Sequence, residues 1–270
     1  MLPVIDQVPP PPFLKWAGGK RWLTHRVKAL ALEQNCTYFE PFLGSAAMFF
    51  HWNPSQAILS DANAALIETY CAIKESADDV SKNLKKHAKK HSSEYYYSIR
   101  SALYESAVER AAQFIYLNWT CWNGLYRVNK LGEFNVPIGT KQNVLLATDN
   151  FQLIAKRLAG ATLLHADFEA QIDKSVEGDF IFADPPYTVR HKHNGFVKYN
   201  EQSFSWDDQV RLRDAIARAK SRGVKTLVSN ADHESIRELY RGFELSEVSR
   251  YSAIAGVGAK RGSFDELLIG

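Results

Sequence analysis

Short runs of apolar residues alternate with helical patterns at both ends of the chain. The runs that favour β-strands are 36–40, 57–60, 161–165, 180–183, 224–229, 243–248 and 266–269. Between them, residues 46–52 read as an apolar helix, and residues 207–222 carry apolar side chains at helical spacing along one stripe. Strands that alternate with helices predict an α/β fold, with a mostly parallel sheet and helices on both faces.

The middle of the chain has a different pattern. From about Ala62 to Ala159 the spacing is mainly helical, and nothing there indicates a core strand. Residues 129–132 have the composition of a turn between two short extended arms, which predicts a β-hairpin. The basic run 82–91 has a solvated helix face as its simplest interpretation. We therefore expect a core domain, residues 1–61 and 160–270, into which a mainly helical recognition domain, residues 62–159, is inserted.

Composition limits the class of protein. The chain has 270 residues, of which 46% are hydrophobic and 23% charged, which is ordinary for a globular protein and excludes disordered, collagen-like and coiled-coil classes. The net charge of +3 does not by itself indicate a nucleic-acid binder. The three cysteines, Cys36, Cys71 and Cys121, are odd in number and far apart in the sequence. This pattern predicts a protein of the reducing cytoplasm that has no disulfide bonds. We expect no signal peptide and no membrane span, because polar residues, Gly or Pro interrupt the uncharged stretches.

The segment that carries the clearest chemistry is FIFADPPY, residues 180–187. Its apolar half predicts a buried strand, and the polar half follows at the carboxyl end, where open α/β sheets bind ligands. There the Asp184 carboxylate and the Pro185 carbonyl can both accept hydrogen bonds, and Tyr187 supplies a flat ring. These groups suit a planar amine such as an amino-purine, because accepting both N–H protons turns the nitrogen lone pair toward an electrophile. The alternative is that the two prolines only end the strand.

Two glycine-containing segments precede it, KWAGGK at residues 15–20 and FEPFLGS at residues 39–45. The second has the order strand, small turn, helix, so its backbone can approach a nucleoside closely. Neither segment matches the dinucleotide-binding or the P-loop pattern. Asp61 ends the next strand, at the position where an acidic residue of nucleotide-binding α/β folds binds the ribose hydroxyls. An equally good interpretation is that Asp61 is the N-cap of the following helix.

Together these motifs resemble the Dam-type DNA adenine N6-methyltransferases. Segments 15–20, 39–45, 123–139 and 184–187 occur in that family's order, and segments 204–213, 228–230 and 261–268 are similar as well. The resemblance implies a Rossmann-like S-adenosylmethionine (AdoMet)-dependent methyltransferase core with an inserted target-recognition domain that carries the hairpin. It also implies AdoMet as methyl donor, S-adenosylhomocysteine as product, double-stranded DNA as substrate and GATC as the site. It further implies action in the cytoplasm of a bacterial or phage-infected cell, and leaves open whether the enzyme acts alone or with a restriction enzyme.

The resemblance assigns residues to three roles. Cofactor binding is implied for Trp16, Lys20, Phe42, Gly44, Asp61, Asp167, Phe168 and Asp184. Catalysis on a flipped adenine is implied for Asp184, Pro185, Pro186 and Tyr187. DNA contacts are implied for Lys15, Trp122, Asn123, Leu125, Arg127, Asn135, Pro137 and Lys141. Among these, Trp122 would intercalate and Lys15 would contact the outer guanine. An arginine such as Arg127 on a guanine is the commonest specific base contact.

One departure from the family affects the recognition sequence. After Asn135-Val136-Pro137 the family often continues with Phe-Gly-Arg-Tyr, whereas this chain has Ile138-Gly139-Thr140-Lys141. An aromatic that helps to read the first base pair is thus replaced by Lys141.

Other interpretations remain open at this stage. They are methylation of cytosine N4, another recognition sequence, and a DNA-binding protein that only senses AdoMet. Asp184 favours adenine, because cytosine N4 enzymes usually have Ser there. No metal site is expected, since His191 and His193 form only an H-x-H in a basic stretch. Residues 188–200 are expected to be a loop that orders over DNA, with an ordinary surface loop as the alternative.

Overall fold

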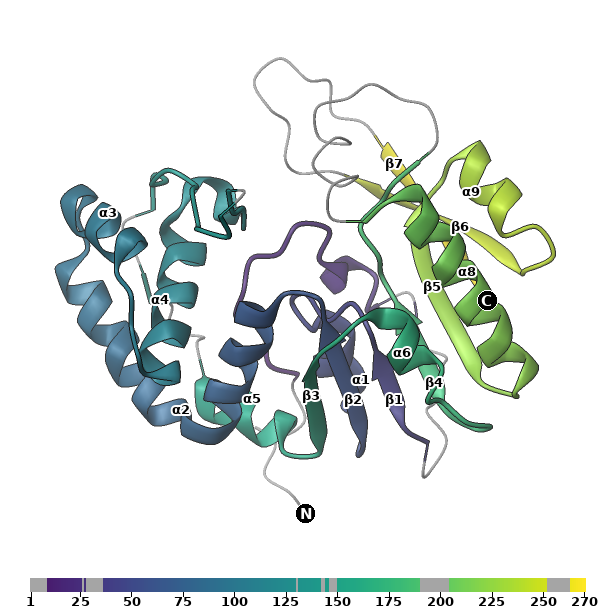
Figure 1. Ribbon diagram of the computed structural model, residues 1–270, viewed down its shortest axis with the longest axis horizontal. Helices are drawn as coiled ribbons and strands as arrows, with labels where there is room; N and C mark the ends of the chain where they lie inside the picture. Colours follow the sequence, from purple (N-terminus) through teal and green to yellow (C-terminus); the bar gives the residue numbers. More distant parts are fainter. Residues whose placement is uncertain are drawn as a thin grey trace. The chain divides into compact units, whose positions relative to one another are not determined.

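The computed structural model describes residues 9–25, 27, 36–129, 131–141, 144–145, 150–189, 204–251 and 263–270. Its strands (Figure 1) are β1 (Tyr38–Glu40), β2 (Ala57–Asp61), β3 (Ala161–His165), β4 (Phe180–Ala183), β5 (Lys225–Ala231), β6 (Leu245–Tyr251) and β7 (Ser263–Ile269). Its α-helices are α1 (Ala47–Trp52), α2 (Ala64–Lys90), α3 (Ser93–Ser101), α4 (Ala107–Thr120), α5 (Phe151–Leu158), α6 (Phe168–Ile172), α8 (Trp206–Ser221) and α9 (Glu234–Leu239). Two short 3₁₀ helices are η2 (Lys20–Trp22) and η3 (Trp122–Gly124).

The strands form one seven-stranded sheet in the order β3-β2-β1-β4-β5-β7-β6. β1 is parallel to β2 and β4, β4 is parallel to β5, and β7 is antiparallel to both β5 and β6. This confirms the predicted α/β fold, which is Rossmann-like because the strand order reverses between β1 and β4. Since β1 and β4 are parallel neighbours, with Tyr38 opposite Phe180, the loops after their carboxyl ends leave the same edge of the sheet.

All seven predicted strands are present, and their bounds differ mainly in the antiparallel part. β6 begins two residues later than predicted, because the Phe243 N–H bonds the Tyr240 carbonyl in a turn and its ring packs edge-on against the Tyr240 ring, 5.4 Å between centroids. β7 begins earlier than predicted, at Ser263, because its pairing with β6 extends as far as Tyr251. Pairing partners therefore determine these ends.

The chain divides into two compact units. One contains the described residues within 1–30, 44–55 and 61–165, and the other contains those within 31–43, 56–60 and 166–270. The predicted insert, residues 62–159, lies in the first unit together with the N-terminal segment. Its assignment as a separate target-recognition domain stays a prediction.

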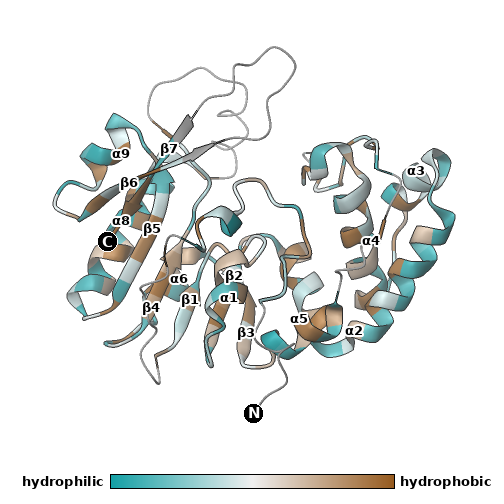
Figure 2. Cartoon of the chain, turned by 180° about the vertical axis from the view of Figure 1, so that it is seen from behind, coloured by the Kyte–Doolittle hydropathy of each residue, from teal (hydrophilic) through white to brown (hydrophobic). Residues whose placement is uncertain are grey.

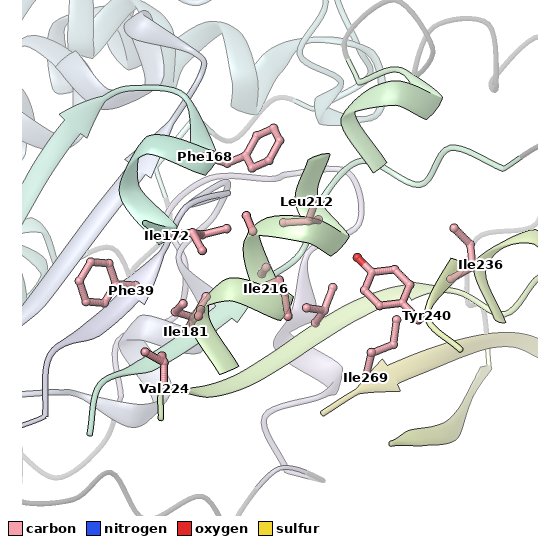
Figure 3. Packing of buried hydrophobic residues seen from close by; sticks show 14 of the residues in the cluster. Phe39, Phe168, Ile172, Ile181, Leu212, Ile216, Val224, Ile236, Tyr240 and Ile269 are labelled. Carbon is pink, nitrogen blue, oxygen red and sulfur yellow. The ribbon is translucent and has the colours of Figure 1, made fainter. Parts of the chain in front are cut away.

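The second unit has a hydrophobic core beneath α8. Ile181 and Val228 from the sheet pack with Leu212 and Ile216 from α8, all with 0% exposure (Figure 3). All residues of β4 are buried, as expected of a central strand of a parallel sheet. A capping box starts α8, since the Ser205 side chain accepts from the Asp208 N–H and the Asp208 side chain accepts from the Ser205 N–H.

The first unit is mainly helical, with α2 packed against α4 and α5. Asn63 caps α2 by accepting from the Leu66 N–H at 3.1 Å. The predicted basic run forms the last turns of α2, where its lysines are exposed and hydrophilic residues follow one side of the helix (Figure 2). His87 in the same run is buried, which lowers its pKa to about 4. The lysines thus form a solvated face of the helix, as the simplest interpretation of the run predicted.

The predicted hairpin is also present in the first unit. Val128 and Phe134 form an antiparallel bridge, and the Asn135 N–H donates to the Arg127 carbonyl at 3.1 Å. A second bridge joins Cys121 and Ile138. Within the described residues no helix is both long and apolar enough to cross a bilayer.

Candidate active site

The Asp184 carboxylate lies at the end of β4 and is half-buried. The hydroxyl of Ser229, a fully buried residue of the neighbouring strand β5, donates to Asp184 Oδ1 at 2.6 Å. Strand pairing produces this contact, because Ala183 of β4 lies opposite Val228 of β5. Sequence reasoning noted the segment 228–230 but assigned no role to Ser229.

Tyr187, in the same loop, donates its phenol proton to Glu266 Oε2 at 2.6 Å. Glu266 belongs to β7 and has a buried side chain. Burial, and then the charges of Asp184 and Glu266, raise the pKa of Tyr187 well above its usual value. Tyr187 is therefore a neutral hydrogen-bond donor at physiological pH.

A buried amide holds the backbone of this loop. Gln209 of α8 has 0% exposure, and its Nε2 donates to the Thr188 carbonyl at 3.3 Å and to the Pro186 carbonyl at 3.5 Å. Asn230 of β5 donates to Gln209 Oε1 at 3.0 Å. The loop after β4 is thus anchored to α8 and β5, which fixes where its carbonyls point.

The second unit also brings together the residues predicted near the adenine ring of the cofactor. The rings of Phe42 and Phe168 stack with 5.2 Å between centroids, and the Arg211 guanidinium lies 4.8 Å from the Phe168 centroid. Asp167 Oδ1 accepts from the Glu169 N–H at 3.0 Å as the N-cap of α6, and from Arg211 Nη2 at 2.9 Å. These contacts form an aromatic wall with an exposed acid beside it.

In the first unit, Gly44 and Asp61 are in contact. The Gly44 N–H donates to Asp61 Oδ2 at 3.1 Å, and the Asn63 N–H donates to Asp61 Oδ1 at 2.9 Å. Burial raises the pKa of Asp61, and these two N–H groups partly offset that effect. The N-cap of α2 is Asn63, so the helix-cap interpretation of Asp61 is wrong. Its carboxylate instead ties the turn after β1 to the end of β2.

Trp16 packs directly on this turn. A Cβ added to Gly44 would lie 2.8 Å from Trp16 Cδ1, so only glycine leaves room for the indole. The indole stacks on Phe114, 6.4 Å between centroids, and on Tyr126, 5.6 Å between centroids. Lys20 is buried and its Nζ donates to the Gly18 carbonyl at 2.8 Å. An aromatic ring, an acceptor carboxylate and a turn without side chain fit the nucleoside of AdoMet.

The hairpin presents several of the predicted DNA contacts. Trp122 is 53% exposed, and Asn123 beside it has a left-handed backbone with φ 55°. Arg127 Nε donates to Asn135 Oδ1 at 2.8 Å, so these two predicted DNA contacts are bonded to each other. Pro137 is exposed and Leu125 is half-buried. The arrangement makes Asn135 a support for Arg127.

Lys15 lies against the η3 turn. Its N–H donates to Asn118 Oδ1 at 2.9 Å, and its side chain occupies the space that a Cβ on Gly124 would fill. Burial, and then the nearby ammonium of Lys141, lower the pKa of Lys15 to about 8. The structure thus places Lys141 beside Lys15, and their roles in DNA recognition stay predictions.

No three His, Cys, Asp or Glu side chains gather around a possible ion in the described part of the chain. Cys36, Cys71 and Cys121 are free thiols. Residues 190–203, which include His191, His193 and most of the predicted DNA-ordering loop, lie outside the described residues, as does Arg261.

Comparison with known proteins agrees with this geometry. Residues 16–254 match the family of D12 class N6 adenine-specific DNA methyltransferases. The chain is 34% identical to the type II methyltransferase M1.LlaDCHI of Lactococcus lactis subsp. cremoris, over 96% of this chain and 94% of the relative. It is 35% identical to the type II methyltransferase M.MjaIII of Methanocaldococcus jannaschii, over 93% and 94%, respectively. It is 33% identical to the DNA adenine methylase of Vibrio cholerae serotype O1, over 95% and 94%. The chain therefore belongs to the D12 class of N6 adenine-specific DNA methyltransferases, enzymes that act on DNA and take the methyl group from AdoMet.

Proposed function

We propose that this enzyme methylates N6 of the adenine in GATC after flipping that adenine out of duplex DNA. The observation that carries the proposal is the loop 184–187, held at the carboxyl end of β4, next to the point where the strand order reverses. That edge of an open α/β sheet is where ligands bind. An enzyme must extrude a base to reach its exocyclic amine, because the duplex buries it.

The chemistry follows from hydrogen-bond capacity. The Asp184 carboxylate and the Pro185 carbonyl accept the two N6 protons, which directs the nitrogen lone pair away from the ring. The Tyr187 ring stacks on the flipped base and holds it flat. Bound AdoMet supplies an electrophilic methyl on its sulfonium sulfur. The chain contributes positioning and acceptors aimed in advance, and the displaced proton leaves to water.

The cofactor and the DNA are bound by the residues that the family resemblance assigns. Trp16, Lys20, Gly44 and Asp61, together with Phe42, Asp167, Phe168 and Asp184, bind AdoMet, and S-adenosylhomocysteine leaves from the same residues. Trp122 intercalates beside the flipped base, which its exposure permits. Arg127 reads a guanine, Lys15 contacts the guanine of the first base pair, and the other DNA contacts are Asn123, Leu125, Asn135, Pro137 and Lys141. The enzyme acts in the cytoplasm of a bacterial or phage-infected cell.

Sequencing tests the reaction and its site. Plasmid DNA without adenine methylation is incubated with the enzyme and AdoMet, and modified bases are mapped. We expect N6-methyladenine in GATC. Modified adenines at another sequence would refute the GATC assignment, and N4-methylcytosine would refute the adenine reaction.

A variant tests the catalytic assignment. Asp184→Ala should keep less than about a tenth of the wild-type turnover, a loss of at least about 1.4 kcal/mol of barrier stabilisation. Asp207→Ala, which removes an exposed carboxylate from the first turn of α8, serves as the control. Turnover near the wild-type value in Asp184→Ala would remove Asp184 from the catalytic group.

A further inference from the structure

Two carboxylates and two hydroxyls lie together behind the loop 184–187. We call them the acid–hydroxyl cluster: Asp184, Ser229, Tyr187 and Glu266. Ser229 Oγ is 2.6 Å from Asp184 Oδ1, and the Tyr187 phenol oxygen is 2.6 Å from Glu266 Oε2. Asp184 and Ser229 both lie close enough to the Tyr187 phenol to affect its pKa, so the two pairs adjoin.

In both pairs the hydroxyl is the hydrogen-bond donor and the carboxylate is the acceptor. An ionised carboxylate only accepts hydrogen bonds, and each hydroxyl carries one proton. Ser229 therefore donates to Asp184, and Tyr187 donates to Glu266. Bonds of this kind, with a charged acceptor, are about twice as strong as bonds between neutral groups.

The partners differ in how firmly the fold holds them. Asp184 and Tyr187 belong to a loop without regular structure, whereas Ser229 and Glu266 belong to the paired strands β5 and β7. Ser229 has 0% exposure and Glu266 has 6%. A buried carboxylate is stabilised by a hydrogen-bond donor, and the Tyr187 phenol supplies one to Glu266. The rigid sheet thereby orients the two loop side chains.

We propose that Ser229 and Glu266 are positioning residues for methyl transfer. Ser229 sets the plane of the Asp184 carboxylate, and Glu266 sets the ring of Tyr187 through its phenol. The inference rests on the proposed function, in which Asp184 and Tyr187 contact the target adenine. Misplacement of catalytic groups by about 1 Å can slow a reaction roughly 100-fold, so loss of either support should affect the rate more than binding.

Four variants separate the two supports. Ser229→Ala removes the donor to Asp184, and Glu266→Leu removes the acceptor of Tyr187. Glu266→Gln keeps an acceptor oxygen for the phenol, and Tyr187→Phe keeps the ring but removes the donor. Matched controls lie on the same strands. Thr226→Val removes a hydroxyl of β5 that has no hydrogen-bond partner among the described residues, and Asp265→Asn removes a charge from β7 that faces Ser249.

The measurements are the single-turnover rate at saturating duplex and AdoMet, the Kd for each, the fluorescence of 2-aminopurine at the target position, and the free energy of unfolding. We expect Ser229→Ala, Glu266→Leu and Tyr187→Phe to slow transfer by about 10-fold to 100-fold, while both Kd values change less than about threefold. Glu266→Gln should restore most of the rate. Both controls should match the wild type.

A double variant tests whether Tyr187 and Glu266 act as one unit. Tyr187→Phe combined with Glu266→Leu should be no slower than the slower single variant, because each single change already removes the bond. If the rate loss of the double variant equals the product of the two single losses, the two residues act independently. That result would overturn the Glu266 assignment. If Glu266→Leu does not fold, Tyr187→Phe tests the role of Glu266 instead, because it removes the same hydrogen bond. A wild-type rate in Tyr187→Phe would also overturn the Glu266 assignment.

The outcomes distinguish this inference from the function on which it rests. Wild-type rates in Ser229→Ala and Tyr187→Phe, with Asp184→Ala inactive, would overturn the positioning roles and leave the catalytic site in place. An active Asp184→Ala would instead overturn the proposed site. Equal losses of rate, binding and stability in Ser229→Ala would show that this hydroxyl only supports the fold, which also contradicts the proposal.

Discussion

Replacement of Gly44 by alanine tests the cofactor-binding turn of the first unit. Gly44 has φ +47°, and an added Cβ would lie 2.8 Å from Trp16 Cδ1 and 3.1 Å from Trp16 Nε1. The backbone cannot rotate away easily, because its N–H is bonded to Asp61 at 3.1 Å and its carbonyl accepts from the Tyr70 hydroxyl at 3.0 Å. The indole must therefore move.

Two effects set the size of the loss. A left-handed backbone costs an alanine about 1–2 kcal/mol, and crowding in a packed site adds about 1–3 kcal/mol. The free energy of unfolding of Gly44→Ala should thus fall by about 2–5 kcal/mol. If Trp16 binds AdoMet as proposed, displacement of its indole should weaken AdoMet binding by at least about tenfold, which corresponds to about 1.4 kcal/mol.

Urea unfolding and calorimetric titration with AdoMet measure both quantities. Gly242→Ala is the matched control, since Gly242 also has a positive φ, +95°, but no atom of the described residues lies within 4 Å of an added Cβ. The control should lose only the backbone part of the stability and bind AdoMet normally. The reasoning is wrong if both variants lose the same stability, or if Gly44→Ala binds AdoMet as tightly as the wild type.

Three further predictions concern DNA recognition. Arg127→Ala should relax discrimination by about 1–3 kcal/mol at one base pair, and Asn135→Ala should do so more weakly because it removes only the support of Arg127; equal losses on GATC and scrambled duplexes would refute base reading. Lys15, with its pKa lowered to about 8, is mostly charged at pH 7 and mostly neutral at pH 9, so affinity for GATC should fall over that range. Lys141→Ala removes the neighbouring positive charge and should move that fall to higher pH; an unchanged pH profile would contradict the pairing of the two amines. In kcat/KM measurements on hemimethylated duplexes, AATC and TATC should be accepted better than variants of the final C·G pair, because Lys141 offers a flexible donor in place of a planar ring. Equal rejection at both positions would show that another residue compensates.

Local pattern alone determined the elements and the chemical centre of this protein. An apolar run followed by Asp184 predicts a buried strand with an acceptor at its carboxyl end, and β4 has that form. Residues 129–132 predict a turn, and the bridge between Val128 and Phe134 confirms the hairpin. Such features depend on neighbouring residues, whose periodicity is visible along the chain.

Tertiary structure alone decided which polar groups support that centre. Ser229 and Asp184 are 45 residues apart, and Tyr187 and Glu266 are 79 residues apart. A serine or glutamate within an apolar strand carries no local signal of its partner, because the partner depends on which strands are neighbours. The strand order β4-β5-β7 brings these residues together. The antiparallel pairing of β5 with β7 places Glu266 opposite Ala231, within reach of the loop 184–187. The same holds for Asp61, whose bond to Gly44 arises from the meeting of two chain segments and not from the start of a helix.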